Sequence, residues 1–377
     1  MATIRKKRLW VIGIVTAIAS VVAVAAPHAG TNASVPSSWI TQQVNFILSK
    51  QLPSGAIVGA ENLVMPYFGN VGAIGLIAAN TSASRAGALN WMKWYLANLN
   101  PASAQVPANS VFDYTYDPST GSLTPTGDFD SVDSYASTTL NLAYSAFASG
   151  DTTLKSYVSS HISTYEAIAN LLTYSAPAGV RLSSGASSGL TIAKPSYAEA
   201  YTMDNSEVFS GLLQFSQLET SLGRMSQSEY YASWASTTQS SILSKLWNPA
   251  NNNWNSSYGQ PSVSGVFYAD GTAQVWPTLY GVVTPTSARA ITAWAQFSHS
   301  FPDWFNTMPD NYAWTSIARV AQVMGDTAHA STYLTALHKR FSPSGTPPNI
   351  CGVAPCAEWY DNEAGWFIVA GLSTKQI

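Results

Sequence analysis

Uniformly apolar segments alternate with amphipathic segments along most of this chain. The run from Pro66 to Ala79 contains no charged residue, so a helix formed by it is expected to be buried on all sides. The segment from Trp39 to Leu52 instead repeats apolar residues at helical spacing and has one polar face. Helices of the first kind have to lie inside the fold, and helices of the second kind have to cover them.

Six pairs of helices follow from this alternation. The buried helices are predicted at residues 66–79, 131–148, 205–222, 273–283, 310–324 and 362–372. The amphipathic helices are predicted at residues 39–52, 86–99, 153–174, 226–247, 287–299 and 327–341, with the first of them as the partner of the last buried helix.

Acidic residues gather where the predicted buried helices begin. Twelve of the 20 acidic residues fall in six clusters just before these helices or in their first turn. Such residues can cap a helix and complement its dipole, which is an alternative role for each cluster. Because nearly every cluster also has an aromatic neighbour, we expect a shared cleft lined by carboxylates. The clusters are Glu61; Asp128, Asp130 and Asp133; Glu199, Asp204 and Glu207; Asp270; Asp310; and Glu358, Asp361 and Glu363.

The six helical pairs resemble the (α/α)6 barrel, the six-hairpin architecture of many glycoside hydrolases and polysaccharide lyases. The resemblance covers about residues 35–375 and implies an all-α fold, with an inner ring of buried helices and an outer ring of amphipathic ones. The spacing between the pairs is too irregular for a solenoid. In this architecture the loops that lead into the inner helices open on one face and line the substrate cleft, where the acidic clusters of this chain would lie.

Two clusters are similar in placement to the acids of family 8 glycoside hydrolases. Glu61, which precedes the Pro66-Tyr67-Phe68-Gly69 step, resembles the general-acid Glu before the first inner helix of that family. The segment 127–136 looks like the second-helix segment of that family, in which an acid touches the sugar at the cleavage point. The surrounding residues do not match the signatures of family 8, so only the placement is similar.

Glycoside hydrolysis requires two carboxyl groups, one protonated and one ionised. The acid and the base are expected among Glu61, Asp130, Asp133, Asp204 and Glu207. Asp204 and Glu207 are three residues apart at a helix start and share a face. Their repulsion would keep one of them protonated near neutral pH. A capping role, with Asp204 as N-cap and Glu207 at the third position, remains an equal alternative.

Sugars bind to aromatic faces and to hydrogen-bonding side chains. The aromatic residues near the clusters are therefore candidate substrate ligands, although the rim of the core is an equal alternative for each ring. Asp270, Asp310 and Asp361 are expected to bind sugar or to cap helices. The candidate substrate-binding residues are Tyr67, Tyr135, Tyr197, Tyr201, Asp270, Trp276, Asp310, Trp314, Trp359, Asp361 and Trp366.

The first 30 residues have the pattern of a secretory signal peptide. Arg5, Lys6, Lys7 and Arg8 precede an uncharged apolar stretch from Leu9 to Ala26, and Ala23-Val24-Ala25 near its end supplies the small residues of a cleavage site. An uncleaved anchor is the alternative, since the stretch is just long enough to span a bilayer. We expect residues 31–377 to form one exported, monomeric catalytic domain without a further membrane span.

The net charge of the chain limits the classes of molecule that it is expected to bind. Without residues 1–30 the chain has 13 Lys plus Arg against 20 acidic residues, so the net charge of −3 becomes −7. This balance argues against nucleic acid and anionic lipid as partners, and it favours a neutral or mildly cationic polysaccharide as substrate.

The two cysteines of the chain are expected to form a disulfide. Cys351 and Cys356 are close in sequence, and an exported protein meets oxidising conditions.

Other chemistries have weaker support in the sequence. The histidines and cysteines lack metal-ligand spacing, and no nucleophile-elbow, P-loop or dinucleotide motif occurs, so we expect no metal and no cofactor. A polysaccharide lyase on the same fold is one alternative, with Arg181 and Lys194 as neutralisers of a uronate. A carbohydrate-binding surface protein without catalysis is the other. Inverting hydrolysis is what the resemblance to this barrel class implies.

Overall fold

A computed structural model describes residues 35–103, 105–308, 312–341 and 359–373. Six buried helices form a closed inner ring, in which each helix contacts the next and the last contacts the first. The (α/α)6 barrel predicted from the sequence is therefore confirmed. In ring order the inner helices are α2 (Pro66–Ala79), α4 (Val132–Ala148), α7 (Thr202–Ser221), α9 (Thr272–Leu279), α11 (Ser316–Val323) and α13 (Asp361–Gly371).

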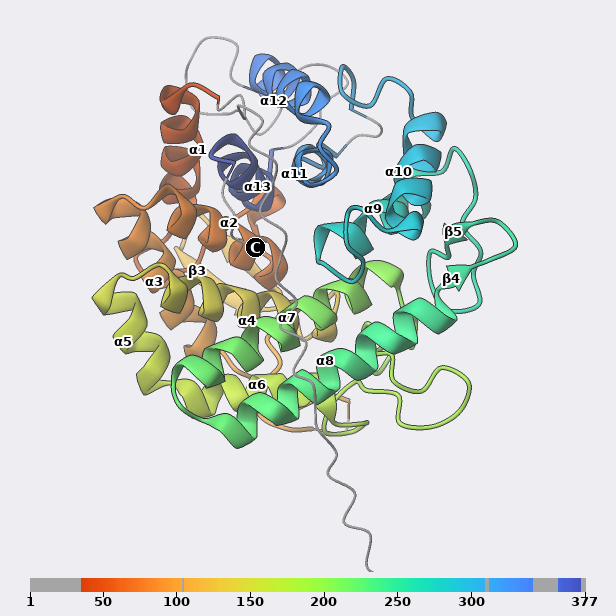
Figure 1. Ribbon diagram of the computed structural model, residues 1–377. Coiled ribbons are helices and arrows are strands. Elements are labelled where there is room, and N and C mark those ends of the chain that lie inside the picture. The colour runs from red at the N-terminus through yellow and green to blue at the C-terminus, as the bar shows by residue number, and fades with distance from the viewer. Residues whose placement is uncertain (1–34, 104, 309–311, 342–358, 374–377) are drawn as a thin grey trace, which may run out of the picture. The chain divides into compact units, whose positions relative to one another are not determined.

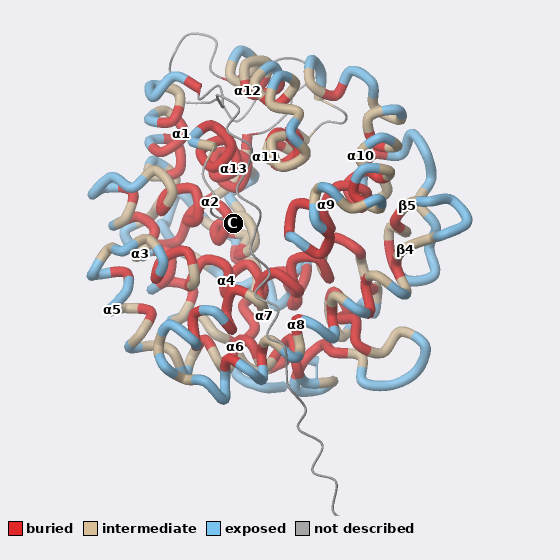
Figure 2. The backbone as a smooth tube through the Cα atoms, viewed as in Figure 1, coloured by how far each residue is buried: buried red, intermediate tan, exposed pale blue. Residues whose placement is uncertain are grey.

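The amphipathic helices lie against this ring and cover it (Figure 1). Their outward faces are exposed, whereas the inner helices are buried almost throughout (Figure 2). The α1 helix contacts both α13 and α2, as expected for the partner of the last inner helix. The outer helices are α1 (Ser37–Lys50), α3 (Ser82–Ala97), α5 (Thr152–Ser160), α6 (Ile162–Thr173), α8 (Met225–Lys245), α10 (Ala288–Ser300) and α12 (Thr327–Phe341).

Glycines allow the first and last inner helices to approach closely. A Cβ atom on Gly75 of α2 would lie 2.5 Å from the Cα atom of Gly365 in α13. A Cβ atom on Gly365 would lie 2.4 Å from the carbonyl oxygen of Val71. Since no side chain fits in either position, both glycines are required for the ring to close.

Several details differ from the prediction. The α9 helix ends at Leu279 instead of at Val283, and the α3 helix begins at Ser82 instead of at Ala86. The outer helix expected at residues 153–174 is two helices, because the backbone at His161 leaves helical geometry. The α11 helix begins at Ser316 instead of at Asp310, after Trp314 in a left-handed conformation with φ of 50°. Short strands also occur in the loops, as an antiparallel sheet of β1 (Leu63–Val64), β2 (Tyr114–Asp117) and β3 (Ser122–Pro125) and a pair of β4 (Trp247–Asn248) and β5 (Asn253–Trp254).

Hydrogen bonds join the starts of the inner helices to one another. The Tyr67 hydroxyl at the start of α2 donates to Glu207 in the first turns of α7. The backbone N–H of Thr315, just before α11, donates to Glu363 in the first turn of α13 over 2.6 Å. The starts of α2 and α7 therefore lie close together at one end of the ring, and the starts of α11 and α13 lie close to each other.

Candidate active site

Three carboxyl groups from two neighbouring inner helices lie together at this end of the ring. Asp133 lies in the first turn of α4, and Asp204 and Glu207 lie in the first turns of α7. Their charges act on one another, and the pKa of each is raised, with burial as the largest cause. We refer to these three residues as the carboxyl cluster.

Glu207 is fixed by two donors from other inner helices. Its Oε1 atom accepts a hydrogen bond of 2.7 Å from the Tyr67 hydroxyl of α2 and one of 3.0 Å from the Trp276 Nε1 of α9. The residue is 1% exposed. Burial raises the pKa of Glu207 to about 7, although both donors favour the ionised form and oppose the rise. Glu207 is thus a rigid buried carboxyl that titrates near neutral pH.

Asp133 is buried, and both of its carboxylate oxygens accept hydrogen bonds from neighbouring groups. Its Oδ1 atom accepts from the Ser131 hydroxyl at 2.6 Å and from the Ser134 backbone N–H at 3.0 Å, and its Oδ2 atom accepts from the Thr191 hydroxyl at 2.7 Å. Burial raises the pKa of Asp133 to about 6 despite these donors. With its oxygens occupied, Asp133 contributes its charge to the cluster and not a free oxygen atom.

Asp204 alone among the three is only half-buried. Burial is the largest cause that raises its pKa well above the ordinary value, followed by the charges of Asp133, Glu207 and Asp130. Like charges close together favour the protonated form of one of them. The protonated form of Asp204 is therefore favoured while the side chain remains reachable from solvent, and a general acid requires both properties.

Asp130 and Asp113 add two carboxyls beside the cluster. Asp130 is exposed, and its backbone N–H donates to the Tyr135 hydroxyl at 3.2 Å. The same hydroxyl donates to Asp113 Oδ1 at 2.7 Å. Burial raises the pKa of Asp113 to about 6, and desolvation by the surrounding protein raises the pKa of Asp130, with Lys194 opposing that rise. Asp113 was not predicted, because it precedes a strand in a loop far in sequence from every helix start.

Aromatic rings line the same end. Tyr268 stacks on Trp314 with 5.3 Å between ring centroids, and Trp314 contacts Tyr312 at 4.9 Å. The hydroxyls of Tyr197 and Tyr201 hydrogen-bond to each other over 2.9 Å. Tyr197, Tyr201 and Trp314 were predicted as substrate ligands, and each is at least partly exposed here.

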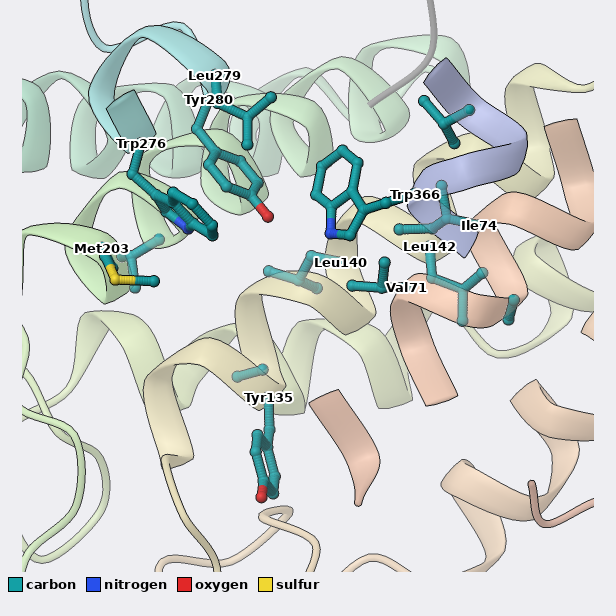
Figure 3. Packing of buried hydrophobic residues seen from close by; sticks show 14 of the residues in the cluster. Val71, Ile74, Tyr135, Leu140, Leu142, Met203, Trp276, Leu279, Tyr280 and Trp366 are labelled. Carbon is teal, nitrogen blue, oxygen red and sulfur yellow. The ribbon is translucent and has the colours of Figure 1, made fainter. Parts of the chain in front are cut away.

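Other residues that were predicted to bind sugar are buried in the core instead. Trp359 is 1% exposed and donates to Gln43 of α1, and Trp366 lies in the interior beside Tyr280 (Figure 3). Both tryptophans belong to the core, because Trp359 packs on Phe341 of α12 and Trp366 packs on Tyr280. Tyr135 and Trp276 are also buried, and they hold carboxyl groups in place.

The remaining predicted acids are not part of the carboxyl cluster. Glu61 is exposed in a left-handed turn before β1, and it is not among the charges that dominate the pKa of Asp204 or Glu207. Asp270 accepts a hydrogen bond of 2.6 Å from the Val263 N–H and so fixes its own loop. Asp361 is buried at the start of α13. Asp310, Cys351 and Cys356 lie outside the described residues.

The two cations that a lyase would need to neutralise a uronate differ in position. Arg181 is 2% exposed and donates to the carbonyls of Leu172 and Gly189, so it stabilises a loop in the interior. Lys194 lies at the site but is paired with Asp128 at 3.0 Å. Arg181 is therefore too deeply buried to reach a uronate, and Lys194 is already paired.

Within the described ranges, no three His, Cys, Asp or Glu side chains are arranged to hold a metal ion together. No helix in the same part of the chain is long and apolar enough to cross a membrane.

Solved structures share this fold. A wild-type glycosidase is similar with a TM-score of 0.61 at 12% identity, over 89% of this chain and 96% of that one. The GH63 mannosylglycerate hydrolase from Thermus thermophilus has a TM-score of 0.59 at 10% identity, over 88% and 99% of the two chains. The GH76 α-mannanase from Bacteroides thetaiotaomicron has a TM-score of 0.56 at 9% identity, over 89% and 94%.

These likenesses support the barrel fold independently of the sequence pattern. No protein-family profile matches the chain, and no curated protein matches it. At such low identity the solved structures establish the six-hairpin fold without assigning the chain to one glycosidase family.

The raised pKa values make the stability of the protein depend on pH. Burial raises the pKa of Asp113 and Asp133 to about 6 and that of Glu207 and Asp361 to about 7. Between about pH 4 and pH 7 the folded state therefore holds more protons than the unfolded state does. The free energy of unfolding should be highest near pH 4 and fall as the pH rises to 7, as measured by urea titration across this range. A rise over the same interval would contradict the assigned shifts.

Proposed function

We propose that this protein is a glycoside hydrolase in which Asp204 is the general acid and Asp130 is the ionised partner. The observation that carries the proposal is the state of Asp204, a half-buried carboxyl whose pKa is raised by burial and by the charges of Asp133, Glu207 and Asp130. The carboxyl cluster thus supplies the protonated member of the pair that glycosidic cleavage needs, and the exposed Asp130 supplies the other.

In the proposed reaction Asp204 donates its proton to the glycosidic oxygen as the bond from that oxygen to the anomeric carbon breaks. The leaving sugar departs as an alcohol. The Asp130 carboxylate removes a proton from a water molecule as the water attacks the anomeric carbon, which gives inversion, the outcome that the resemblance to the barrel class implies. Glu207 and Asp133 act through Asp204, because their charges keep it protonated.

The substrate is proposed to be a neutral or mildly cationic polysaccharide or oligosaccharide. Asp130 and Asp113 give the site a negative charge, while Lys194 is occupied by Asp128. An anionic sugar would be repelled under these conditions. The basic and apolar segment at residues 5–26 supports export of the protein to the medium in which such polymers occur.

Incubation with a panel of neutral, amino-substituted and uronate-containing glycans tests the proposal. Release of new reducing ends from a neutral or amino-substituted glycan, without ultraviolet absorbance from an unsaturated product, is the expected result. Reducing ends accompanied by that absorbance would identify a lyase. Binding of a glycan without cleavage would identify a carbohydrate-binding protein, and either outcome would overturn the proposal.

Tyr67→Phe should change the pH dependence of turnover. The substitution removes the hydroxyl that donates to Glu207 and favours its ionised form, so Glu207 carries less negative charge. The pKa of Asp204 then falls, and the alkaline limb of the pH–rate profile moves to lower pH. We expect turnover near neutral pH to decrease about tenfold, within the range for a hydrogen bond to a charged group.

Tyr165→Phe is the matched control for this experiment. Tyr165 is also a buried tyrosine, but it lies on the outer helix α6 and does not touch the carboxyl cluster. Its pH–rate profile should coincide with that of the wild-type protein. An unchanged profile in Tyr67→Phe would rule out the role given to the Tyr67 hydroxyl.

A further inference from the structure

Tyr268 is an exposed aromatic ring with a rigid support. It is 58% exposed, in the turn that precedes α9. Its ring stacks on Trp314 with 5.3 Å between centroids and 25° between ring planes. Large rings are usually mostly buried, so the exposure of this supported ring is unusual and leaves aromatic surface available for contact.

The turn that carries Tyr268 is attached to the start of the helix that carries Asp204. The Thr272 hydroxyl donates to the Met203 Sδ atom at 2.8 Å, and Met203 directly precedes Asp204. The charges of Asp204 and Asp130 both act on the Tyr268 phenol, which also places the ring close to these two carboxyls. Tyr268 thus lies within electrostatic range of both carboxyls to which cleavage is assigned, on a segment that is joined to the start of α7.

A chain of rings connects Tyr268 with the support of Glu207. Trp314 meets Trp276 edge to face, with 5.7 Å between centroids, and the Trp276 indole donates to Glu207. Trp314 has a backbone φ of 50°, a conformation that costs a bulky residue about 1–3 kcal/mol and persists only where the surroundings impose it. The Tyr268 ring therefore rests on a fixed base at the carboxyl cluster.

We propose that Tyr268 is the platform on which one sugar ring next to the cleaved bond stacks. This inference rests on the proposed glycoside hydrolase function and adds the chemical class of the recognised group. A pyranose ring has one face of C–H groups, which fits the negative face of an aromatic ring, and its hydroxyls remain at the edge for polar contacts. The occupant is therefore a pyranose ring without negative charge and with an unobstructed C–H face.

Steady-state kinetics of Tyr268→Ala and Tyr268→Phe on a cleaved glycan test this platform. Loss of the ring in Tyr268→Ala should lower kcat/KM about tenfold, mainly through a higher KM, whereas Tyr268→Phe keeps the ring and should stay within about twofold of the wild-type value. The control is Tyr230→Ala, which removes a ring 40% exposed on the outer helix α8. Equal kinetics for Tyr268→Ala and Tyr230→Ala would overturn the inference.

Two further measurements separate this inference from the proposed function. If the wild-type protein binds a glycan without cleaving it, the proposed function fails, and calorimetry with that glycan still tests Tyr268 through the affinities of the same variants. If Tyr268→Ala unfolds at a lower temperature, Tyr268→Trp takes its place, since it retains a stacking face and should keep wild-type kcat/KM. Weaker binding by Tyr268→Phe to the same extent as Tyr268→Ala would assign the effect to the hydroxyl and overturn the stacking role.

Discussion

Asp204→Asn should lower turnover on a glycan substrate about 10³-fold, within the range typical for loss of a general acid. The amide keeps the shape of the side chain and can still accept a hydrogen bond, but it has no proton to give to the leaving oxygen. The substitution also removes a carboxyl that is repelled by Asp133, Glu207 and Asp130 when ionised. The thermal midpoint of the variant near neutral pH should therefore equal or exceed that of the wild-type protein.

The thermal midpoint decides how a loss of activity is interpreted. A variant that is inactive and also unfolds at a lower temperature would assign Asp204 a structural role in the first turn of α7, although not the predicted capping role, because the N-cap of α7 is Tyr201. Glu207→Gln gives a second comparison, because Glu207 is buried and acts through Asp204. Its turnover should fall less than that of Asp204→Asn, and a larger fall would make Glu207 the acid.

Asp130→Asn should lower turnover by about 10²- to 10⁴-fold, because the variant lacks the carboxylate that activates water. Asp130 is exposed, so its substitution should leave the fold unaffected. A small anionic nucleophile such as azide should restore part of the activity, since it needs no general base. The measurement is turnover of an aryl glycoside with and without azide.

Asp128→Asn is the matched control for Asp130. Asp128 lies two residues away, is exposed and pairs with Lys194. Its loss should change turnover by less than about threefold, as expected for an exposed ion pair. If Asp130→Asn remains active while Asp113→Asn is inactive and rescued by azide, the ionised partner is Asp113.

Most of the fold could be predicted from local sequence patterns. The bounds of α2 and α12 coincide with the prediction, because the composition changes sharply at Pro66, at Ala79 and at Thr327. The break at His161 could not be predicted, since residues on both sides keep helical periodicity. The late start of α11 depends on the left-handed backbone of Trp314, for which the sequence carries no glycine or asparagine signal.

The candidate site could be predicted only in part. The acidic residues at the predicted helix starts included Asp133, Asp204 and Glu207. The ring of inner helices brings these three residues together. The sequence could not distinguish a ring that faces sugar from one that holds a carboxyl, so Tyr67 and Trp276 were predicted as ligands although they donate to Glu207. Asp113 reaches the site through a loop and a contact with Tyr135, 22 residues away in sequence. Such long-range contacts leave no local pattern.

The central claim is that Asp204 protonates the leaving oxygen of a glycoside. It is tested most directly by kcat/KM of wild-type protein and Asp204→Asn on aryl glycosides whose leaving groups range from acidic to weakly acidic phenols. Wild-type rates should depend little on the leaving group. The variant should be nearly as fast as the wild-type protein on the most acidic phenol and progressively slower as the phenol becomes less acidic, because only poor leaving groups need the proton. An equal loss on every leaving group would contradict the assignment of Asp204 as the general acid.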